Sequence, residues 1–123
     1  MPTRTKSKTP AQTPVKAKAK TKAIAKAAPV TVVALIQAKP GKTTALKRAL
    51  TAMVAATRTE AGCLNYDLHQ DTEDTRNFIF HENWTSEAHL SAHLDSPHLH
   101  AFRAQADELL AEPPKMWRAK RVA

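Results

Sequence analysis

Apolar and polar residues follow a regular order only from residue 30 onward. Residues 30–36 (VTVVALI) are almost continuously apolar and rich in β-branched side chains, which is typical of a strand covered on both faces. In residues 46–57, apolar side chains recur at steps of three and four, which predicts an amphipathic helix. Residues 63–70 and 78–84 alternate between apolar and polar, and the polar turn at 71–76 predicts an antiparallel hairpin.

The alternation also assigns side chains to the two faces of the hairpin. In its first strand, it places Leu64 on the same face as Tyr66 and Leu68. In its second strand, one face carries three aromatic residues and one acid: Phe78, Phe80, Glu82 and Trp84. The opposite face carries His81 and Asn83, which we expect to meet a partner subunit.

The C-terminal part predicts two helices and a last strand. Residues 86–94 have helical spacing and begin with a serine placed to cap the first turn. A second start signal follows at Ser96 and Pro97, because proline is tolerated at the first helical position. Two prolines at 113–114 end this longer helix, and residues 116–122 supply the strand.

The resulting order is β-α-β-β-α(α)-β. Two right-handed βαβ halves merged into one antiparallel sheet, with helices on one face, form the α+β ferredoxin-like arrangement. Nothing in residues 29–123 remains to cover the second face, although two strands carry apolar side chains on both faces. We therefore expect a homodimer in which the sheets of two copies pack against each other.

Residues 1–28 differ in composition from the rest of the chain. They consist mainly of Lys, Thr, Ala and Pro, and they contain eight basic residues and no acid. Their few bulky apolar side chains cannot offset the entropy of ordering the backbone, so we expect a disordered tail before a folded domain at 29–123. That domain holds eleven basic and eleven acidic residues, so the net charge of +8 lies in the tail.

This uneven distribution of charge limits how the protein can contact other macromolecules. The tail predicts weak, non-specific contact with nucleic acid or an anionic surface, rather than a basic groove on the domain. A purely solubilising role for the tail is the alternative. The chain has no apolar run that suits a secretion signal or a membrane span, and its single cysteine, Cys63, excludes an intrachain disulfide. These features favour a cytoplasmic location.

Five of the six histidines lie within residues 78–102. His93 and His98 flank the break between the two predicted C-terminal helices and are placed to converge on the mouth of a pocket. Histidine suits a general base because its unperturbed pKa of about 6.5 lies near working pH. We interpret both as candidate catalytic residues, with His93 the stronger; the alternatives are packing for His93 and a helix-cap role for His98.

Glu82 is the third candidate catalytic residue. Burial against Phe80 and Trp84 would raise its pKa or require a partner, so a structural ion pair is the alternative. An apolar substrate pocket would be lined by aromatic side chains, and the candidates are Tyr66, Phe80, Trp84 and Phe102. For Trp84 and Tyr66, packing in the core is the alternative.

The sequence contains no cofactor motif. With only two glycines it has no phosphate-binding loop and no flavin or nicotinamide fingerprint. His89 and His93 have the i, i+4 spacing that can chelate zinc, but the sequence places no third ligand beside them. We therefore expect neither cofactor nor metal. Cofactor-free oxygenation would need only a base, a donor for the oxyanion and a dry apolar cavity.

Four segments together resemble the antibiotic biosynthesis monooxygenase domain, and most closely its quinol-monooxygenase-like members. They are KPGK at 39–42, EAGCLNYDLH at 60–69, FIFHENW at 78–84, and AHLDSPH at 92–98 with Phe102. The resemblance covers about residues 30–121. It implies a dimeric α+β barrel with a pocket between sheet and helices in each protomer. Some members oxygenate hydroquinones or anthrones with O2 and without metal or flavin.

We therefore expect a cofactor-independent monooxygenase that oxidises a small quinol-like aromatic with O2. Two alternatives stay open: an isomerase of small phosphorylated ketones, similar to a sister group that acts on phosphorylated autoinducer-2, and a non-catalytic dimeric module tethered by its tail. The scarcity of cations near the candidate site favours oxygenation over isomerisation. A haem-degrading branch also exists, but its key asparagine, tryptophan and histidine correspond to Val33, His93 and Arg103, so haem is not expected.

Overall fold

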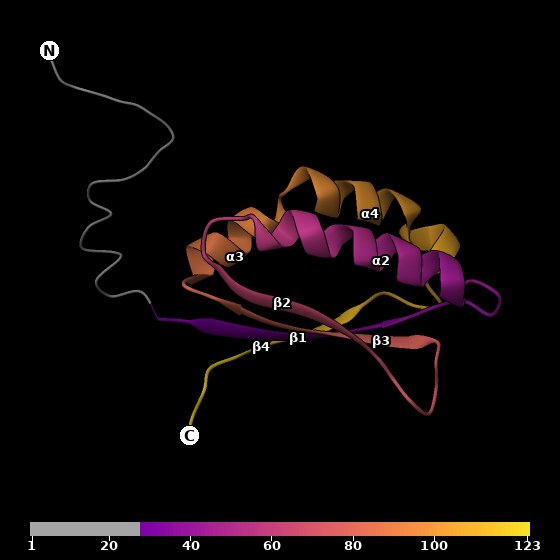
Figure 1. The fold of residues 1–123 in the computed structure, drawn as a ribbon, viewed down its shortest axis with the longest axis horizontal. Coiled ribbons are helices and arrows are strands. Elements are labelled where there is room, and N and C mark those ends of the chain that lie inside the picture. The colour runs from indigo at the N-terminus through magenta and orange to yellow at the C-terminus, as the bar shows by residue number, and fades with distance from the viewer. Residues whose placement is uncertain (1–27) are drawn as a thin grey trace, which may run out of the picture.

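The computed structural model describes residues 28–123, and the expected tail at 1–28 lies outside them except for its last residue (Figure 1). The elements occur in the predicted order: β1 (Val30–Gln37), α2 (Thr43–Arg58), β2 (Cys63–Gln70), β3 (Asn77–Trp84), α3 (Glu87–Leu94), α4 (Pro97–Leu109) and β4 (Lys115–Ala119). The last strand begins one residue earlier and ends three residues earlier than the sequence predicts. No helix among these residues is long and apolar enough to cross a membrane.

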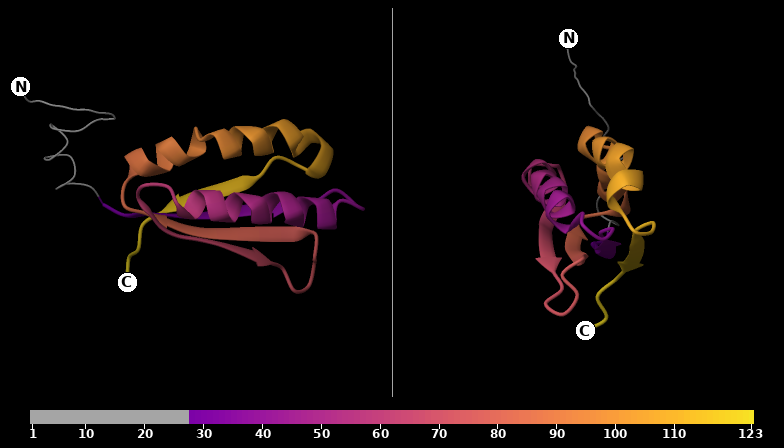
Figure 2. Two further views of the ribbon diagram at one scale, coloured as in Figure 1. Left: turned by 45° about the horizontal axis from the view of Figure 1, so that its top comes forward. Right: turned by 90° about the vertical axis from the view of Figure 1, so that its right-hand side faces the viewer.

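The four strands form one antiparallel sheet in the order β2-β3-β1-β4. All three described helices lie on the same side of this sheet, with α2 above β2 and α4 toward β4 (Figure 2). This is the predicted ferredoxin-like α+β fold. Its two central strands, β1 and β3, come from the two halves of the chain.

Within residues 28–123, strand β1 is covered on one face only. Val30, Val32, Ala34 and Ile36 are buried beneath the helices, while the alternating residues between them are half-buried. Its nearly continuous apolar run predicted cover on both faces. The open face thus carries apolar side chains that the described residues leave uncovered, including Val33 and its neighbour on β4, Trp117.

The predicted face of Leu64 is wrong. The pairing of β2 with β3 shifts register between Cys63 and Asn65, so that Leu64 is an extra residue and its side chain is 57% exposed. A bulge of this kind reverses the alternation on one side of it. Cys63 rather than Leu64 therefore shares the helix-covered face with Tyr66.

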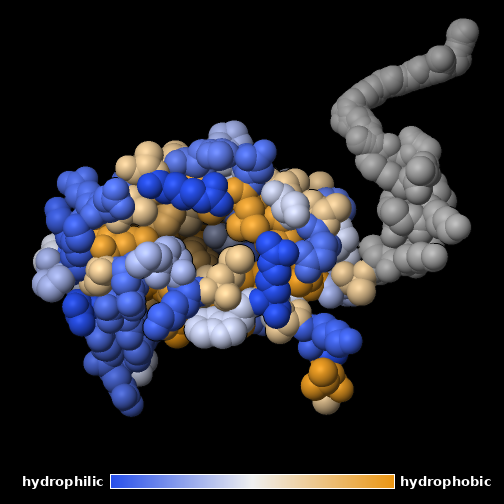
Figure 3. All heavy atoms as spheres, turned by 180° about the vertical axis from the view of Figure 1, so that it is seen from behind, coloured by the Kyte–Doolittle hydropathy of each residue, from blue (hydrophilic) through white to orange (hydrophobic). Residues whose placement is uncertain are grey.

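Strand β4 is the exposed edge of the sheet, and all five of its residues are exposed. From the side of α4 and β4, the surface is hollowed between the helical layer and the sheet, and hydrophobic residues line part of this hollow (Figure 3). The helices therefore cover the central strands β1 and β3 and leave the sheet open toward β4.

Candidate functional site

One carboxylate joins the two candidate histidines. The Oε2 atom of Glu60 lies 2.9 Å from Nδ1 of His93 and 2.8 Å from Nε2 of His98. Glu60 belongs to the turn after α2, whereas His93 is near the end of α3 and His98 near the start of α4. The structure thus brings together both predicted histidines, and it does so through a residue that the sequence analysis did not single out.

Glu60 lies in a tight turn that a hydrogen bond and a glycine stabilise. The backbone N–H of Glu60 donates to the carbonyl of Thr57 at 2.9 Å, and Gly62 has a left-handed φ of +82°. A Cβ at position 62 would lie 2.2 Å from Cγ of His89, so the chain needs glycine there for space as well as for conformation. The tight turn therefore directs Glu60 toward α3 and α4.

His93 is enclosed by aromatic rings and is 1% exposed. Its ring lies 4.6 Å from that of Trp84 and meets the ring of Tyr66 edge-on at 5.3 Å. Burial lowers the pKa of His93, and Glu60 acts in the opposite direction. Because a carboxylate only accepts hydrogen bonds, the proton of the neutral imidazole is on Nδ1, and Nε2 carries the lone pair that can accept a proton.

His98 is less buried and faces a groove. Its Nε2 atom is also 3.1 Å from Oγ1 of Thr57 and 3.3 Å from Oγ of Ser96. It lines a groove of about 420 Å³ between α2 and α4, which Phe102 lines as well. The ring centroids of His93 and His98 are 6.1 Å apart, so the groove begins beside the buried His93.

Ser96 begins α4 at the predicted position, with Pro97 in its first turn, but its side chain makes no capping hydrogen bond. Its hydroxyl lies against His98 instead. Ser86 does cap α3, because its oxygen accepts a hydrogen bond from the backbone N–H of His89. The local signals therefore located both helix starts, while packing decided what each hydroxyl contacts.

Glu82 is a buried carboxyl group, 5% exposed, on the helix-covered face of β3. Its Oε1 accepts a 2.9 Å hydrogen bond from Nε1 of Trp84, and it takes part in no ion pair within residues 28–123. Burial raises the pKa of Glu82 to about 7, against the opposing effect of the Trp84 hydrogen bond. Near neutral pH this group can therefore either hold or release a proton.

The four candidate lining residues divide into two groups. Tyr66, Phe80 and Trp84 are buried beside Glu82 and His93, and the rings of Tyr66 and Phe80 lie 4.6 Å apart. Burial and the nearby Glu82 raise the pKa of Tyr66, which keeps its hydroxyl protonated. Phe102 is separate from this group, on α4.

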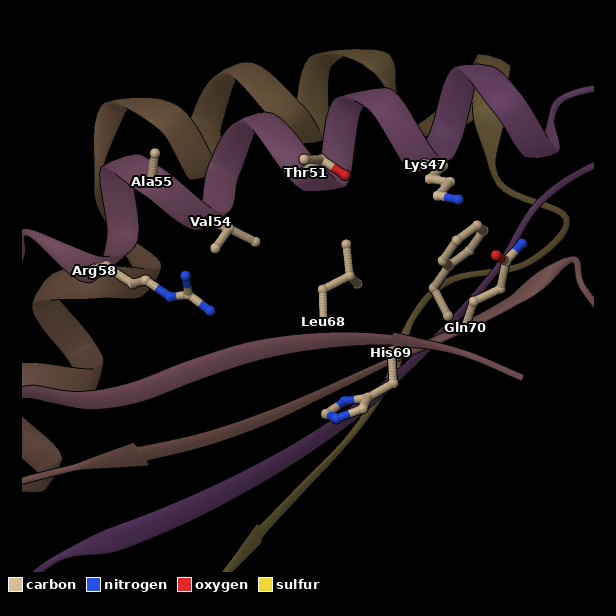
Figure 4. Close-up of a pocket in the computed structure, with 9 residues that line it drawn as sticks. Lys47, Thr51, Val54, Ala55, Arg58, Leu68, His69 and Gln70 are labelled. Atoms are coloured by element: carbon tan, nitrogen blue, oxygen red, sulfur yellow. The ribbon is translucent and has the colours of Figure 1, made fainter. Parts of the chain in front are cut away.

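A second cavity, of about 510 Å³, lies between α2 and β2 (Figure 4). Its apolar residues include Val54, Leu68 and Phe78, and two cations, Lys47 and Arg58, also line it. The Arg58 guanidinium donates to the Tyr66 carbonyl at 3.2 Å and to the Asp67 carboxylate at 3.1 Å. None of the seven predicted site residues lines this cavity. Sequence reasoning missed it because its walls come from two elements that meet only in the fold.

The remaining histidines of residues 78–102 point elsewhere. Nδ1 of His89 lies 2.9 Å from Oγ1 of Thr85 and 3.0 Å from Oγ of Ser86, so the sequence-based pair of His89 with His93 does not converge. His100 is exposed and contacts Asp95. His81 is exposed on the open face of the sheet. Among the described residues, the set with three suitable metal-ligand atoms within 4.8 Å of one another is Glu60, His93 and His98.

Comparison with known proteins places the chain in a family. Residues 29–105 match the family described as antibiotic biosynthesis monooxygenase. A Mycobacterium tuberculosis protein named "Putative monooxygenase Rv0793" is 38% identical over 86 residues, which are 70% of this chain and 84% of that protein. "Putative monooxygenase YcnE" of Bacillus subtilis is 30% identical over 84 residues, which are 68% of this chain and 88% of that protein.

Solved structures agree with the sequence relatives. The crystal structure of PA3566 from Pseudomonas aeruginosa has a TM-score of 0.75 at 42% identity, covering 78% of this chain and 96% of that one. The structure of Rv0793 has a TM-score of 0.74 at 33% identity, covering 78% and 97%. These matches confirm the resemblance that the four sequence segments predicted. The chain belongs to the antibiotic biosynthesis monooxygenase family and is monooxygenase-like.

Proposed function

We propose that the protein is a cofactor-independent monooxygenase that oxidises a small quinol-like aromatic with O2, and that His93 is its general base. The observation that carries this proposal is the hydrogen bond from Nδ1 of His93 to Glu60 inside a wall of aromatic rings. It leaves Nε2 free to accept a phenolic proton, and it places a negative charge where the resulting imidazolium is stabilised.

The reaction balances without an external reductant. Deprotonation of a hydroquinone by His93 gives an electron-rich phenolate, which O2 can oxidise. One oxygen atom enters the ring, the other leaves as water, and the substrate supplies all four electrons as it becomes a hydroxyquinone. Tyr66, Phe80 and Trp84 are themselves buried and surround His93 with apolar rings that exclude water from it.

Glu82 is the second proton-transfer group in this proposal. Its pKa of about 7 lets it hold a proton when the substrate binds and donate it to reduced oxygen afterwards. The Trp84 indole keeps the carboxyl group in one orientation on the sheet. Substrate entry is expected from the groove beside His98 and Phe102, because His93 itself is enclosed.

One observation favours the isomerase alternative. Lys47 and Arg58 line the cavity between α2 and β2, and two cations of this kind suit a phosphorylated substrate (Figure 4). Neither His93 nor Glu82 lines this cavity, so an isomerase acting there would need other groups for its proton transfer. An isomerase consumes no O2, so oxygen uptake separates the two functions.

The deciding experiment is an oxygen-electrode assay of the full chain, treated with a chelator, against a panel of hydroquinones. We expect uptake of one O2 per hydroquinone, with loss of uptake in His93→Gln and full uptake in the exposed-histidine control His100→Gln. No uptake with any hydroquinone, together with turnover of a phosphorylated ketone, would establish the isomerase instead.

We also propose that the functional unit is a homodimer. The open face of the sheet carries Val33, Leu35, Ile79 and Trp117, which no part of residues 28–123 covers. Burial of such apolar area against a second copy would stabilise the pair of sheets.

A further inference from the structure

We propose that Glu60, His93 and His98 form a binding site for a divalent transition-metal ion such as Zn²⁺, and that a metal bound there switches off the base. The metal site is inferred from the geometry alone. The inhibitory effect of a bound metal rests on the proposed function, because it concerns the role of His93 as a general base.

The donor atoms suit such an ion. Two imidazole nitrogens and one carboxylate oxygen are the ligands that Zn²⁺ and Co²⁺ accept readily, whereas Mg²⁺ and Ca²⁺ prefer sets of oxygens. Three protein ligands with a place for water are also the usual composition of an open zinc site. Glu60 and His98 are each partly exposed, which leaves room for that water.

The distances bring these atoms close to a coordinating arrangement. Oε2 of Glu60 lies 2.9 Å from Nδ1 of His93 and 2.8 Å from Nε2 of His98, and all three atoms fall within 4.8 Å of one another. Tetrahedral zinc with bonds of about 2.0–2.2 Å separates its ligands by about 3.3 Å. Shifts of about 1 Å are therefore enough for these atoms to coordinate the ion. The carboxylate and His98 make these shifts, because His93 is enclosed.

The surroundings hold the ligands in place before any ion arrives. His93 is fixed between the rings of Trp84 and Tyr66, so it loses little rotational freedom on binding. Oγ1 of Thr57 and Oγ of Ser96 lie 3.1 and 3.3 Å from Nε2 of His98. Both hydroxyls are placed to hydrogen-bond a water molecule on the metal.

Coordination changes which nitrogen of His93 can act. Without metal, Nδ1 carries the proton and donates a hydrogen bond to Glu60, and Nε2 offers its lone pair. With metal on Nδ1, the neutral imidazole must carry its proton on Nε2, so no lone pair remains for the substrate. Metal and substrate proton therefore compete for one imidazole, and a bound ion is an inhibitor of this site.

The test begins with metal binding by the full, chelator-treated chain. We expect one Co²⁺ per chain, with the visible absorption of a tetrahedral site, displaced by Zn²⁺ in calorimetry. Glu60→Gln and His98→Gln should each weaken Zn²⁺ binding at least tenfold, while His100→Gln, which alters an exposed histidine, should leave it unchanged. Wild-type protein that binds no Co²⁺ or Zn²⁺ at millimolar concentration overturns the proposal, whether or not the variants fold. Binding that survives both substitutions also overturns it.

Oxygen uptake tests the inhibitory effect of bound zinc separately. We expect Zn²⁺ at saturating concentration to lower turnover at least tenfold, and a chelator to restore it. Unchanged turnover with zinc bound overturns the inhibitory role. If no hydroquinone is oxidised while Glu60→Gln still abolishes zinc binding, the proposed function fails and the metal site stands.

Discussion

The indole Nε1 of Trp84 donates a 2.9 Å hydrogen bond to Oε1 of Glu82, two residues earlier on the same face of β3. A strand places alternate residues side by side, so this contact follows directly from their spacing. It satisfies one oxygen of a buried carboxyl group without neutralising its charge. Glu82 therefore carries an ionisation cost that the fold has not removed.

This cost predicts how stability depends on pH. The pKa of Glu82 is about 7 in the folded chain against an ordinary value of 4.5. Below pH 4.5 the group is protonated in both states, and above pH 7 the folded state bears the full cost of the buried charge, about 3 kcal/mol. Glu82→Gln should therefore gain stability relative to wild type by up to about 3 kcal/mol between pH 4.5 and pH 8. Urea unfolding of both proteins at pH 4.5 and at pH 8 measures this difference in unfolding free energy.

Glu108→Gln is the matched control for that measurement. The side chain of Glu108 is largely exposed, so the same chemical change should alter stability equally at both pH values. A pH-independent difference between Glu82→Gln and wild type would contradict the buried, protonated carboxyl group.

His93→Gln should lower turnover of the hydroquinone substrate by ~10²–10⁴, the usual contribution of a positioned general base. The amide fills similar space and can still donate to Glu60, so circular dichroism and the dimer should change little. Steady-state kinetics beside His100→Gln provides the comparison. Loss of folding in parallel with activity would make His93 a packing residue.

Glu60→Gln should separate a positioning role from a purely structural one. Glu60 acts to raise the pKa of His93, so its neutral isostere should shift the acid limb of the kcat/KM profile to lower pH and reduce kcat. Glu87→Gln removes an acid that pairs with Arg118 at the surface, and it should leave the profile in place. An unshifted profile in Glu60→Gln would show that the histidine titrates independently of Glu60.

Two glycines offer an internal comparison. Gly41 and Gly62 both have a φ of +82°, but a Cβ at 41 meets nothing within 4 Å, whereas one at 62 meets His89 at 2.2 Å. Gly41→Ala should cost about 1 kcal/mol of unfolding free energy for its left-handed backbone. Gly62→Ala should cost about 1–3 kcal/mol more, because the side chain of His89 must move. Equal costs in thermal or urea unfolding would argue against the close approach.

Trp117→Glu should break the proposed dimer. Its side chain is 53% exposed and belongs to the open face, next to Val33. Met116→Glu, one residue earlier on the opposite face of β4, is the control and should leave the dimer intact. Light scattering at micromolar concentration reports the mass of both variants. A wild-type monomer would refute sheet-to-sheet pairing.

The sequence by itself determined the elements and, apart from Leu64, the faces of their side chains, because these depend on neighbours along the chain. Alternation in residues 78–84 placed Glu82 beside Trp84, and serines at the N-cap positions located the starts of α3 and α4. The break between those two helices also singled out His93 and His98. Such signals act over a few residues, so one sequence suffices to find them.

Tertiary structure decided which of these side chains meet. Glu60 reaches His93 and His98 across 33 and 38 residues, and no periodicity of the chain carries that information. The cavity between α2 and β2 likewise arises where two elements pack. The bulge at Leu64 follows from strand pairing, because an extra residue is accommodated only when a partner strand sets the register.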